Sequence, residues 1–278
     1  MRHDPHFQRP APGAACHALP RECARCSHVT STMCRMVGDR TVPALRKHHL
    51  EKGATLERSP RGGVVGVLKR GYLLQERSLP DGRRTVMGLS VPGDVVGEPA
   101  ETGSATAFTA ATPVEICLWE TEEVHRLMET DSAFLRQLMG EMDALHARQL
   151  DMLWQRGALK SHERVVAFLL HAAAIMPSAP APGGGLVVTI ELSRRDWADL
   201  TGTTIESISR EMSRLARLGL VTQLGRGRYH LHDPEGLADL VGIDADGFVC
   251  RASPENPGPR VGGPHRAVAR VRRLEVAP

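Results

Sequence analysis

Two short capped helices joined by a glycine turn constrain the fold of this chain more than any other sequence feature. Ser193 with Asp196, and Thr203 with Glu206, each pair a hydroxyl N-cap with an acid three residues later. After the second start, apolar residues follow at helical spacing, namely Ile205, Ile208, Met212, Leu215 and Leu218. Two helices linked in this way form a helix-turn-helix, whose second helix lies in the major groove of DNA.

The polar face of this second helix carries side chains suited to reading base edges. Arg can bond guanine through two N–H groups, Glu can accept from cytosine, and Ser adapts to either role. The predicted DNA-contacting residues are Thr203, Thr204, Glu206, Ser207, Ser209, Arg210 and Arg214. Glu206 has an alternative role, because an acid in the first helical turn can cap the backbone. Between Ser193 and His230 the chain has seven Arg and four acidic residues, a positive excess that favours DNA phosphates.

A β-hairpin is predicted directly after these helices. Residues 220–223 and 229–231 are β-prone, and Gly225-Arg226-Gly227 between them supplies a turn. A hairpin in this place makes the domain a winged helix. We expect Arg226 and Arg228 to contact DNA phosphates.

Hydrophobic periodicity and turn signals divide the 278 residues into five parts. Residues 41–120 alternate short β-prone runs with Gly and Pro turns, which predicts an all-β barrel or sandwich, called the roll below. A long dimerisation helix follows over 121–156, and the winged helix-turn-helix domain occupies 157–240, so the fold class is α+β. Residues 1–40 are predicted to be a flexible segment that carries cysteines. The Arg- and Pro-rich residues 241–278 are predicted to be a disordered basic tail.

The helix predicted over 121–156, with Thr121 as its N-cap, contains one stripe at alternating spacings of three and four. Such spacing predicts a coiled-coil seam between two copies of the chain. Its members are Leu135, Leu138, Met142, Leu145, Gln149 and Met152. Gln149 is the polar member, and a polar residue in a seam weakens association while it fixes register. The alternative is that this stripe packs on the β-roll of its own chain.

The six cysteines indicate the chemistry of the sensor. The chain shows no membrane-length apolar run and no secretory signal, so we expect a cytoplasmic protein, in which disulfide frameworks are rare. Cys23, Cys26 and Cys34 form a closely spaced set, and Cys117 lies alone in an apolar run. Four thiolates suit a [4Fe–4S] cluster. Zinc, a disulfide switch or haem are alternatives, and Cys117 alone could be a packed core thiol.

The sequence resembles one family of regulators over about residues 42–233. LSRRDWADLTGTTIESISREMSRLARLGLV at 192–221 resembles the DNA-binding helices of the Crp/Fnr family, and ESISR at 206–210 resembles the recognition helix of its Fnr/FixK branch. DGRRTVMGLSVPGDVVGE at 81–98 is similar to the family's cyclic-nucleotide-binding-like β-roll. The resemblance implies a homodimer in which Glu206, Ser209 and Arg210 read inverted repeats of TTGA-like half-sites in double-stranded DNA. It also implies RNA polymerase as a partner.

The resemblance also bears on what the roll senses. Family members that bind cyclic nucleotides hold the phosphate with an Arg shortly after a Gly-Glu pair. Gly97-Glu98 is followed by no Arg or Lys up to Thr112, so we expect no cyclic nucleotide. The cysteine spacing resembles that of oxygen-responsive Fnr proteins, which implies cluster ligands at Cys23, Cys26, Cys34 and Cys117 and no such role for Cys16 or Cys250. The best-studied members have an acid where Gln149 aligns, so the dimerisation threshold is expected to differ.

Catalysis is not expected of this chain. It contains no P-loop, GxSxG or HExxH motif. Ser161, His162 and Glu163 are adjacent on a predicted helix and therefore point in different directions, so they do not make a triad. The sequence predicts a DNA-binding regulator rather than an enzyme.

Overall fold

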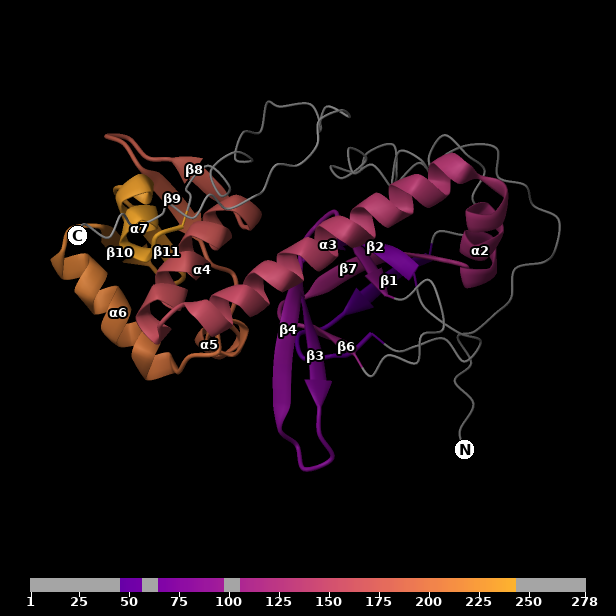
Figure 1. The fold of residues 1–278 in the computed structure, drawn as a ribbon, viewed down its shortest axis with the longest axis horizontal. Coiled ribbons are helices and arrows are strands. Elements are labelled where there is room, and N and C mark those ends of the chain that lie inside the picture. Colours follow the sequence, from indigo (N-terminus) through magenta and orange to yellow (C-terminus); the bar gives the residue numbers. More distant parts are fainter. Residues whose placement is uncertain (1–45, 57–64, 98–105, 244–278) are drawn as a thin grey trace, which may run out of the picture.

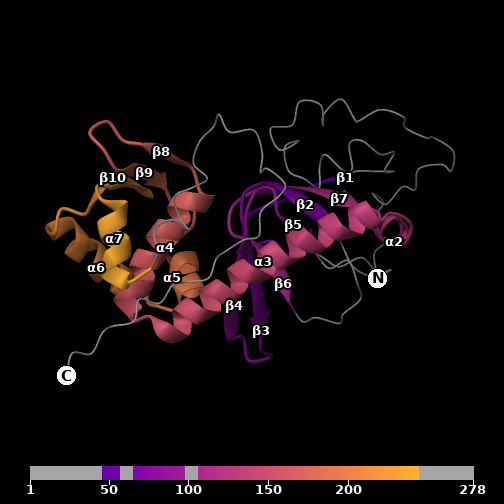
Figure 2. The same cartoon turned by 45° about the horizontal axis from the view of Figure 1, so that its top comes forward.

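The computed structural model describes residues 46–56, 65–97 and 106–243. A β-roll is followed by two helices and then by a compact C-terminal domain (Figures 1 and 2). The long helix α3 (Ser132–Ala158) runs across the roll and ends at the C-terminal domain, so it joins the two.

The roll consists of two facing sheets. One has the strand order β1-β7-β2-β5 and the other β4-β3-β6. The strands are β1 (Arg46–Leu50), β2 (Val65–Arg70), β3 (Leu73–Ser78), β4 (Arg84–Ser90), β5 (Val95–Gly97), β6 (Ala107–Ala110) and β7 (Val114–Trp119). Leu68, Leu73 and Ile116 are fully buried in a core to which both sheets contribute. A turn at Pro80-Asp81-Gly82 joins β3 to β4, and Gly82 adopts the positive φ of 86° that such a turn favours.

The segment predicted as one helix over 121–156 is two helices, α2 (Thr121–Thr130) and α3. Asp131 has an extended backbone that ends α2, and its carboxylate accepts hydrogen bonds from the amides of Ala133 and Phe134 at 2.9 and 3.0 Å. Asp is a strong N-cap, so it both interrupts the helix and restarts it. The prediction of Thr121 as N-cap is wrong, because Glu120 occupies that position.

The C-terminal domain begins with α4 (Ser161–Ile175), as expected. Its sheet has the order β10-β11-β9-β8, with β8 (Ser178–Pro180), β9 (Leu186–Thr189), β10 (Val221–Gly225) and β11 (Arg228–Leu231). The predicted hairpin is therefore confirmed as β10–β11, and the Pro-, Ala- and Gly-rich segment 177–185 contains β8, which pairs with β9. The helix α7 (Pro234–Val241) was not predicted. Three residues in the sequence could have indicated this helix: Asp233 is its N-cap, Pro234 lies in its first turn and Gly242 follows its end.

One hydrophobic core crosses the boundary between the roll and the C-terminal domain. Tyr72, Leu74 and Val86 of the roll belong to the same buried cluster as Phe168 and Trp197. Because these side chains share one core, the structure has an apolar junction between its two domains. A second cluster packs α2 and α3 against the outer face of the sheet that contains β2 and β7.

Several predictions lie outside the described residues. These are the flexible segment 1–40, nearly all of the tail 241–278, and the five cysteines Cys16, Cys23, Cys26, Cys34 and Cys250. Within the described ranges, no helix combines the length and the apolar character needed to cross a membrane.

Candidate DNA-binding and dimerisation surfaces

The helix-turn-helix consists of α5 (Arg194–Thr201) and α6 (Ile205–Arg217). The capping box predicted at Ser193 is confirmed, since its hydroxyl accepts from the amide of Asp196 at 3.1 Å. Gly202 ends α5 in the left-handed region, with φ 60°. The N-cap of α6 is Thr204 rather than the predicted Thr203, and its hydroxyl accepts from the amide of Ser207 at 3.1 Å.

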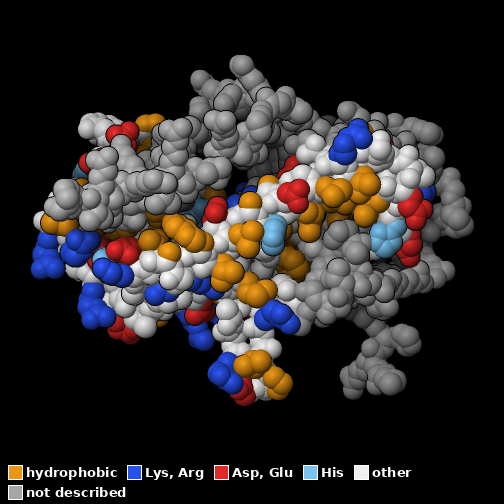
Figure 3. All heavy atoms as spheres, in the orientation of Figure 1, with side chains coloured by type: hydrophobic (Ala, Val, Ile, Leu, Met, Phe, Trp, Pro, Cys, Tyr) orange, Lys and Arg blue, Asp and Glu red, His pale blue; other side chains and the backbone are white. Residues whose placement is uncertain are grey.

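The two faces of α6 differ sharply in burial. Ile208, Met212 and Leu215 are buried, whereas Ile205 and Leu218, predicted as members of the same apolar stripe, are largely exposed. The exposed polar residues of the helix are Glu206, Ser209, Arg210, Ser213 and Arg217. Ser213 and Arg217 were missed, although they follow Arg210 at helical spacing on the same face. The end of the molecule that holds α6 carries a group of Lys and Arg side chains in Figure 3.

Glu206 lies in the first turn of α6 and is exposed. Its pKa is lowered by hydrogen bonds from its own amide and from the Thr204 hydroxyl, and also by Arg210. The carboxylate is therefore charged at neutral pH. The carboxylate accepts from the backbone of the first helical turn, which is the alternative capping role. Because it is exposed, it is also accessible to a DNA base.

Arg214 differs from Arg210 in its surroundings. Its guanidinium forms an ion pair with the buried carboxylate of Glu211, with Nη2–Oε1 at 2.7 Å and Nε–Oε2 at 2.9 Å. Arg210 is exposed, and its one hydrogen bond within the described residues is a long contact of 3.4 Å to the Ser207 hydroxyl. Of the two arginines, Arg210 is thus the one whose donors remain available for a base.

The wing presents two arginines to solvent. Arg226 and Arg228 are both exposed at the β10–β11 turn, where they were expected to contact phosphates. Between them, Gly227 has φ 73°, and a Cβ there would lie 2.7 Å from the carbonyl oxygen of Ile190. The close approach of these backbones explains why glycine occupies this position.

The seam predicted on α3 is largely occupied by the chain itself. Leu138 and Met142 pack with the outer cluster of the roll, Met152 packs against the junction core, and the amide of Gln149 donates to the Oε1 of Gln75. Leu145 is also buried within the single chain. The alternative, in which this stripe packs on the roll, describes these contacts within the single chain, and a seam between two copies through the same residues stays a prediction.

A second apolar stripe on α3 is exposed instead. Met139, Leu150, Leu153 and Trp154 are each 50–65% exposed. At 100° per residue they lie within an arc of about 100° on the helix, beside the face that covers the roll. Leu135 and Met142, both partly exposed, border the two faces. Apolar side chains follow the length of α3 in Figure 3, as expected for a helix that packs against a second copy.

Cys117 is the one predicted cluster ligand within the described residues. It lies in β7 opposite Val67 of β2, with its side chain 9% exposed. Because Val67 and Trp119 belong to the cluster beneath α2 and α3, Cys117 lies on the outer face of the roll rather than between the sheets. In that place Cys117 could hold a cluster together with thiolates from another segment, and the expectation that it does so stays a prediction.

A partly buried histidine at the junction predicts a pH dependence of stability. Burial, with a contribution from Arg148, lowers the pKa of His171 from 6.5 to about 4. The unfolded chain therefore binds more protons than the folded chain between these values, so stability falls as the pH falls through this window. We expect a loss of about 2 kcal/mol between about pH 7 and pH 5, measured by urea unfolding. In the variant His171→Gln this part of the loss should be absent, and an equal loss in both proteins would contradict the assignment.

Comparisons with known proteins agree with this architecture. Residues 163–240 match the Crp-like helix-turn-helix domain. The transcriptional activator protein FnrL of Cereibacter sphaeroides is 27% identical over 187 residues, covering 66% of this chain and 75% of FnrL. The transcriptional regulator LdrP of Thermus thermophilus is 30% identical over 179 residues, covering 64% of this chain and 85% of LdrP. The structure of FixK2 from Bradyrhizobium japonicum superposes with a TM-score of 0.61 at 24% identity, covering 71% of this chain and 97% of FixK2.

A β-roll, a long helix with an exposed apolar stripe and a winged helix-turn-helix together define a DNA-binding transcription regulator. Its relatives are regulators of this kind, and the chain is not an enzyme. The chain belongs to the Crp/Fnr family. FnrL and FixK2, to which it is similar, carry the names of the Fnr/FixK branch.

Proposed function

We propose that this regulator binds palindromic DNA as a homodimer and that an iron–sulfur cluster held by its cysteines makes dimerisation depend on oxygen. The observation that carries the DNA part is the exposed face of α6, with Glu206, Ser209 and Arg210 projecting from a helix whose other face is buried. In the dimer, two such helices enter successive major grooves about 34–36 Å apart. The regulator acts in the cytoplasm and contacts RNA polymerase.

Site selection from a random duplex library tests the DNA part. We expect the wild-type protein to enrich an inverted repeat with TTGA-like half-sites, and a non-palindromic consensus would contradict the proposal. The enriched duplex is called the selected palindrome below.

Arg210→Ala is expected to weaken binding to the selected palindrome by about 1–3 kcal/mol per half-site and to relax one base position. The reason is that Arg210 has free donors near the start of α6, where base edges are met. A matched control is Arg228→Ala in the wing, which should weaken binding to all sequences alike. If Arg210→Ala also weakens all sequences equally, Arg210 is a phosphate contact and the proposal for this residue is wrong.

For the sensor, Cys23, Cys26, Cys34 and Cys117 would hold the cluster, which would supply an oxygen-sensitive link between the N-terminal segment and β7. The position of Cys117 supports this, because β7 leads directly into α2, and the face that carries Cys117 also packs on α3. A change at Cys117 can therefore shift α3 and the stripe by which two chains associate. The absence of Arg and Lys from residues 99–112 argues against a cyclic nucleotide as the ligand.

Cys117→Ala is expected to abolish iron binding while the protein stays folded, because only one small side chain is shortened. The measurement is the iron and acid-labile sulfide content of anaerobically purified protein, expected at about four of each per wild-type chain. Cys250→Ala is the matched control and should retain both. Unchanged iron in Cys117→Ala, or zinc in place of iron in the wild type, would favour the alternative of a zinc- or thiol-based sensor.

A further inference from the structure

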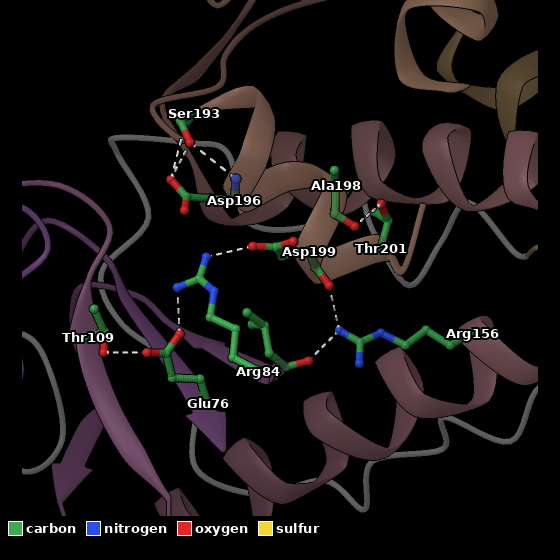
Figure 4. A network of polar contacts seen from close by, with 10 residues as sticks. Glu76, Arg84, Thr109, Arg156, Ser193, Asp196, Ala198, Asp199 and Thr201 are labelled. Atoms are coloured by element: carbon green, nitrogen blue, oxygen red, sulfur yellow. Dashed lines mark hydrogen bonds and ion pairs between the residues drawn. The ribbon is translucent and has the colours of Figure 1, made fainter. Parts of the chain in front are cut away.

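Arg156 occupies the point where the long helix, the roll and the helix-turn-helix meet. It lies near the end of α3, and its guanidinium points away from that helix toward α5 and β4 (Figure 4). Its Nε donates to the carbonyl oxygen of Leu200 at 3.0 Å. Its Nη2 donates to the carbonyl oxygens of Leu200 at 2.6 Å, Asp199 at 3.1 Å and Val86 at 2.5 Å. One side chain thus joins three elements that are far apart in sequence.

The partners of Arg156 have a particular chemistry. In the described part of the chain, its four hydrogen bonds all go to main-chain carbonyls and none to a carboxylate. Two of these carbonyls belong to the last turn of α5, where unsatisfied oxygens and the negative end of the helix dipole attract a cation. Burial lowers the pKa of Arg156, and nearby Arg164 lowers it further. Partial burial therefore disfavours the charged form of this guanidinium, and the groups that it contacts in the described residues are the carbonyl oxygens around it.

A second link between the roll and α5 lies beside it. Arg84 of β4 contacts Glu76 through Nη1–Oε2 at 2.9 Å and Asp199 through Nη2–Oδ2 at 2.6 Å. Glu76 is itself buried and accepts from the Thr109 hydroxyl at 2.8 Å. Asp199 is therefore held through its side chain by Arg84 and through its carbonyl by Arg156 (Figure 4).

The end of α5 determines where α6 begins. Only residues 202–204 separate the two helices, and α6 carries its base-reading residues in its first turns. Gly202, in this linker, has φ 60°, which favours glycine, and a Cβ there would lie 3.2 Å from Nη1 of Arg164. A contact that fixes the last turn of α5 against α3 therefore also fixes the start of α6 against α3.

We propose that Arg156 is a positioning residue that sets the orientation of α6 relative to the dimerisation helix, so that both half-sites of a palindrome are engaged at once. The inference rests on the proposed function, in that it requires α3 to pair two chains. Without the contacts of Arg156, each α6 can still read one half-site. The α6 of the second chain, however, no longer lies at the distance and angle that the other half-site requires. The advantage of two linked binding events depends on such matching geometry.

The test compares the selected palindrome with a duplex in which one half-site is scrambled. For Arg156→Gln, we expect the preference for the palindrome over the half-site duplex to fall at least about 10-fold, with half-site affinity changed less than about threefold. Discrimination against palindromes whose spacer is one base pair longer should also weaken. Arg156→Lys, which keeps the charge but reaches fewer carbonyls, should restore part of the preference.

Two further variants separate positioning from general destabilisation. Arg148→Gln removes a guanidinium from the same helix, but its partner Asp94, 2.6 Å away, belongs to the roll, so the palindrome preference should be unchanged. Asp199→Asn weakens the junction from the side of α5, and its palindrome preference should fall, which keeps the test informative if Arg156→Gln does not fold. An unchanged preference in the Arg156 and Asp199 variants, or an equal loss on both duplexes, would overturn the proposal. If the wild type itself shows no palindrome preference, the proposed dimer fails instead.

Discussion

Leu153→Asp is expected to leave a folded monomer that binds the selected palindrome at least about 100-fold more weakly than the wild type. Leu153 is 65% exposed on the apolar stripe of α3 and belongs to none of the hydrophobic cores found in the described residues. In a twofold interface the change occurs twice, so two carboxylates are brought together and lose water. We estimate a cost to dimerisation of about 3 kcal/mol or more, which corresponds to about 100-fold. Analytical ultracentrifugation and binding to the palindrome measure both effects.

Ala144→Asp provides the matched control. Ala144 is also exposed on α3, but it lies nine residues before Leu153, which places it on the opposite side of the helix. The substitution Ala144→Asp introduces the same charge into the same helix as Leu153→Asp does, and it should leave dimerisation and DNA binding unchanged. If Ala144→Asp dissociates the dimer and Leu153→Asp does not, the two copies meet through a different face of α3.

Trp197→Ala is expected to lower the free energy of unfolding of the C-terminal domain by about 3–5 kcal/mol. Trp197 is 1% exposed, its ring stacks on Phe168 with centroids 5.0 Å apart, and it meets the edge of Tyr229 at 6.4 Å. The Arg194 guanidinium lies 4.7 Å from the centre of the same ring. Truncation removes all three contacts and leaves a cavity in the core that joins α4, α5 and the wing. Urea unfolding followed by circular dichroism measures the change.

Leu224→Ala is the comparison for this substitution. Leu224 lies in β10 of the same domain and is 51% exposed, so its truncation should change stability by less than about 1 kcal/mol. Equal effects of Trp197→Ala and Leu224→Ala would contradict the placement of Trp197 at the centre of the domain.

Local signals in the sequence were sufficient to predict the positions of the helices and the hairpin of the C-terminal domain. The capping box at Ser193, the glycine turn and the apolar periodicity of α6 depend on residues within a few positions of one another. For this reason α5, α6 and the hairpin lie close to where they were predicted. The errors there are small, such as the shift of the N-cap from Thr203 to Thr204, which both carry a hydroxyl.

Which side of α3 faces the roll could not be predicted in the same way. The helix carries two apolar stripes side by side, one containing Leu138 and Met152 and the other containing Leu150 and Leu153. Which stripe covers the roll depends on contacts with residues distant in sequence, such as Gln75, whose side chain accepts from Gln149. The contacts of Arg156 are hidden for the same reason, because a hydrogen bond to a carbonyl 44 residues away leaves no pattern in the sequence.

Operator binding before and after exposure to air tests the central claim most directly. The wild-type protein is purified without oxygen, and its affinity for the selected palindrome and its sedimentation are measured on one sample before and after air is admitted. We predict that affinity falls at least about 10-fold as dimer gives way to monomer, together with loss of acid-labile sulfide, and that Cys117→Ala behaves like the oxidised protein from the start. Unchanged affinity and an unchanged dimer after complete loss of sulfide would contradict the account.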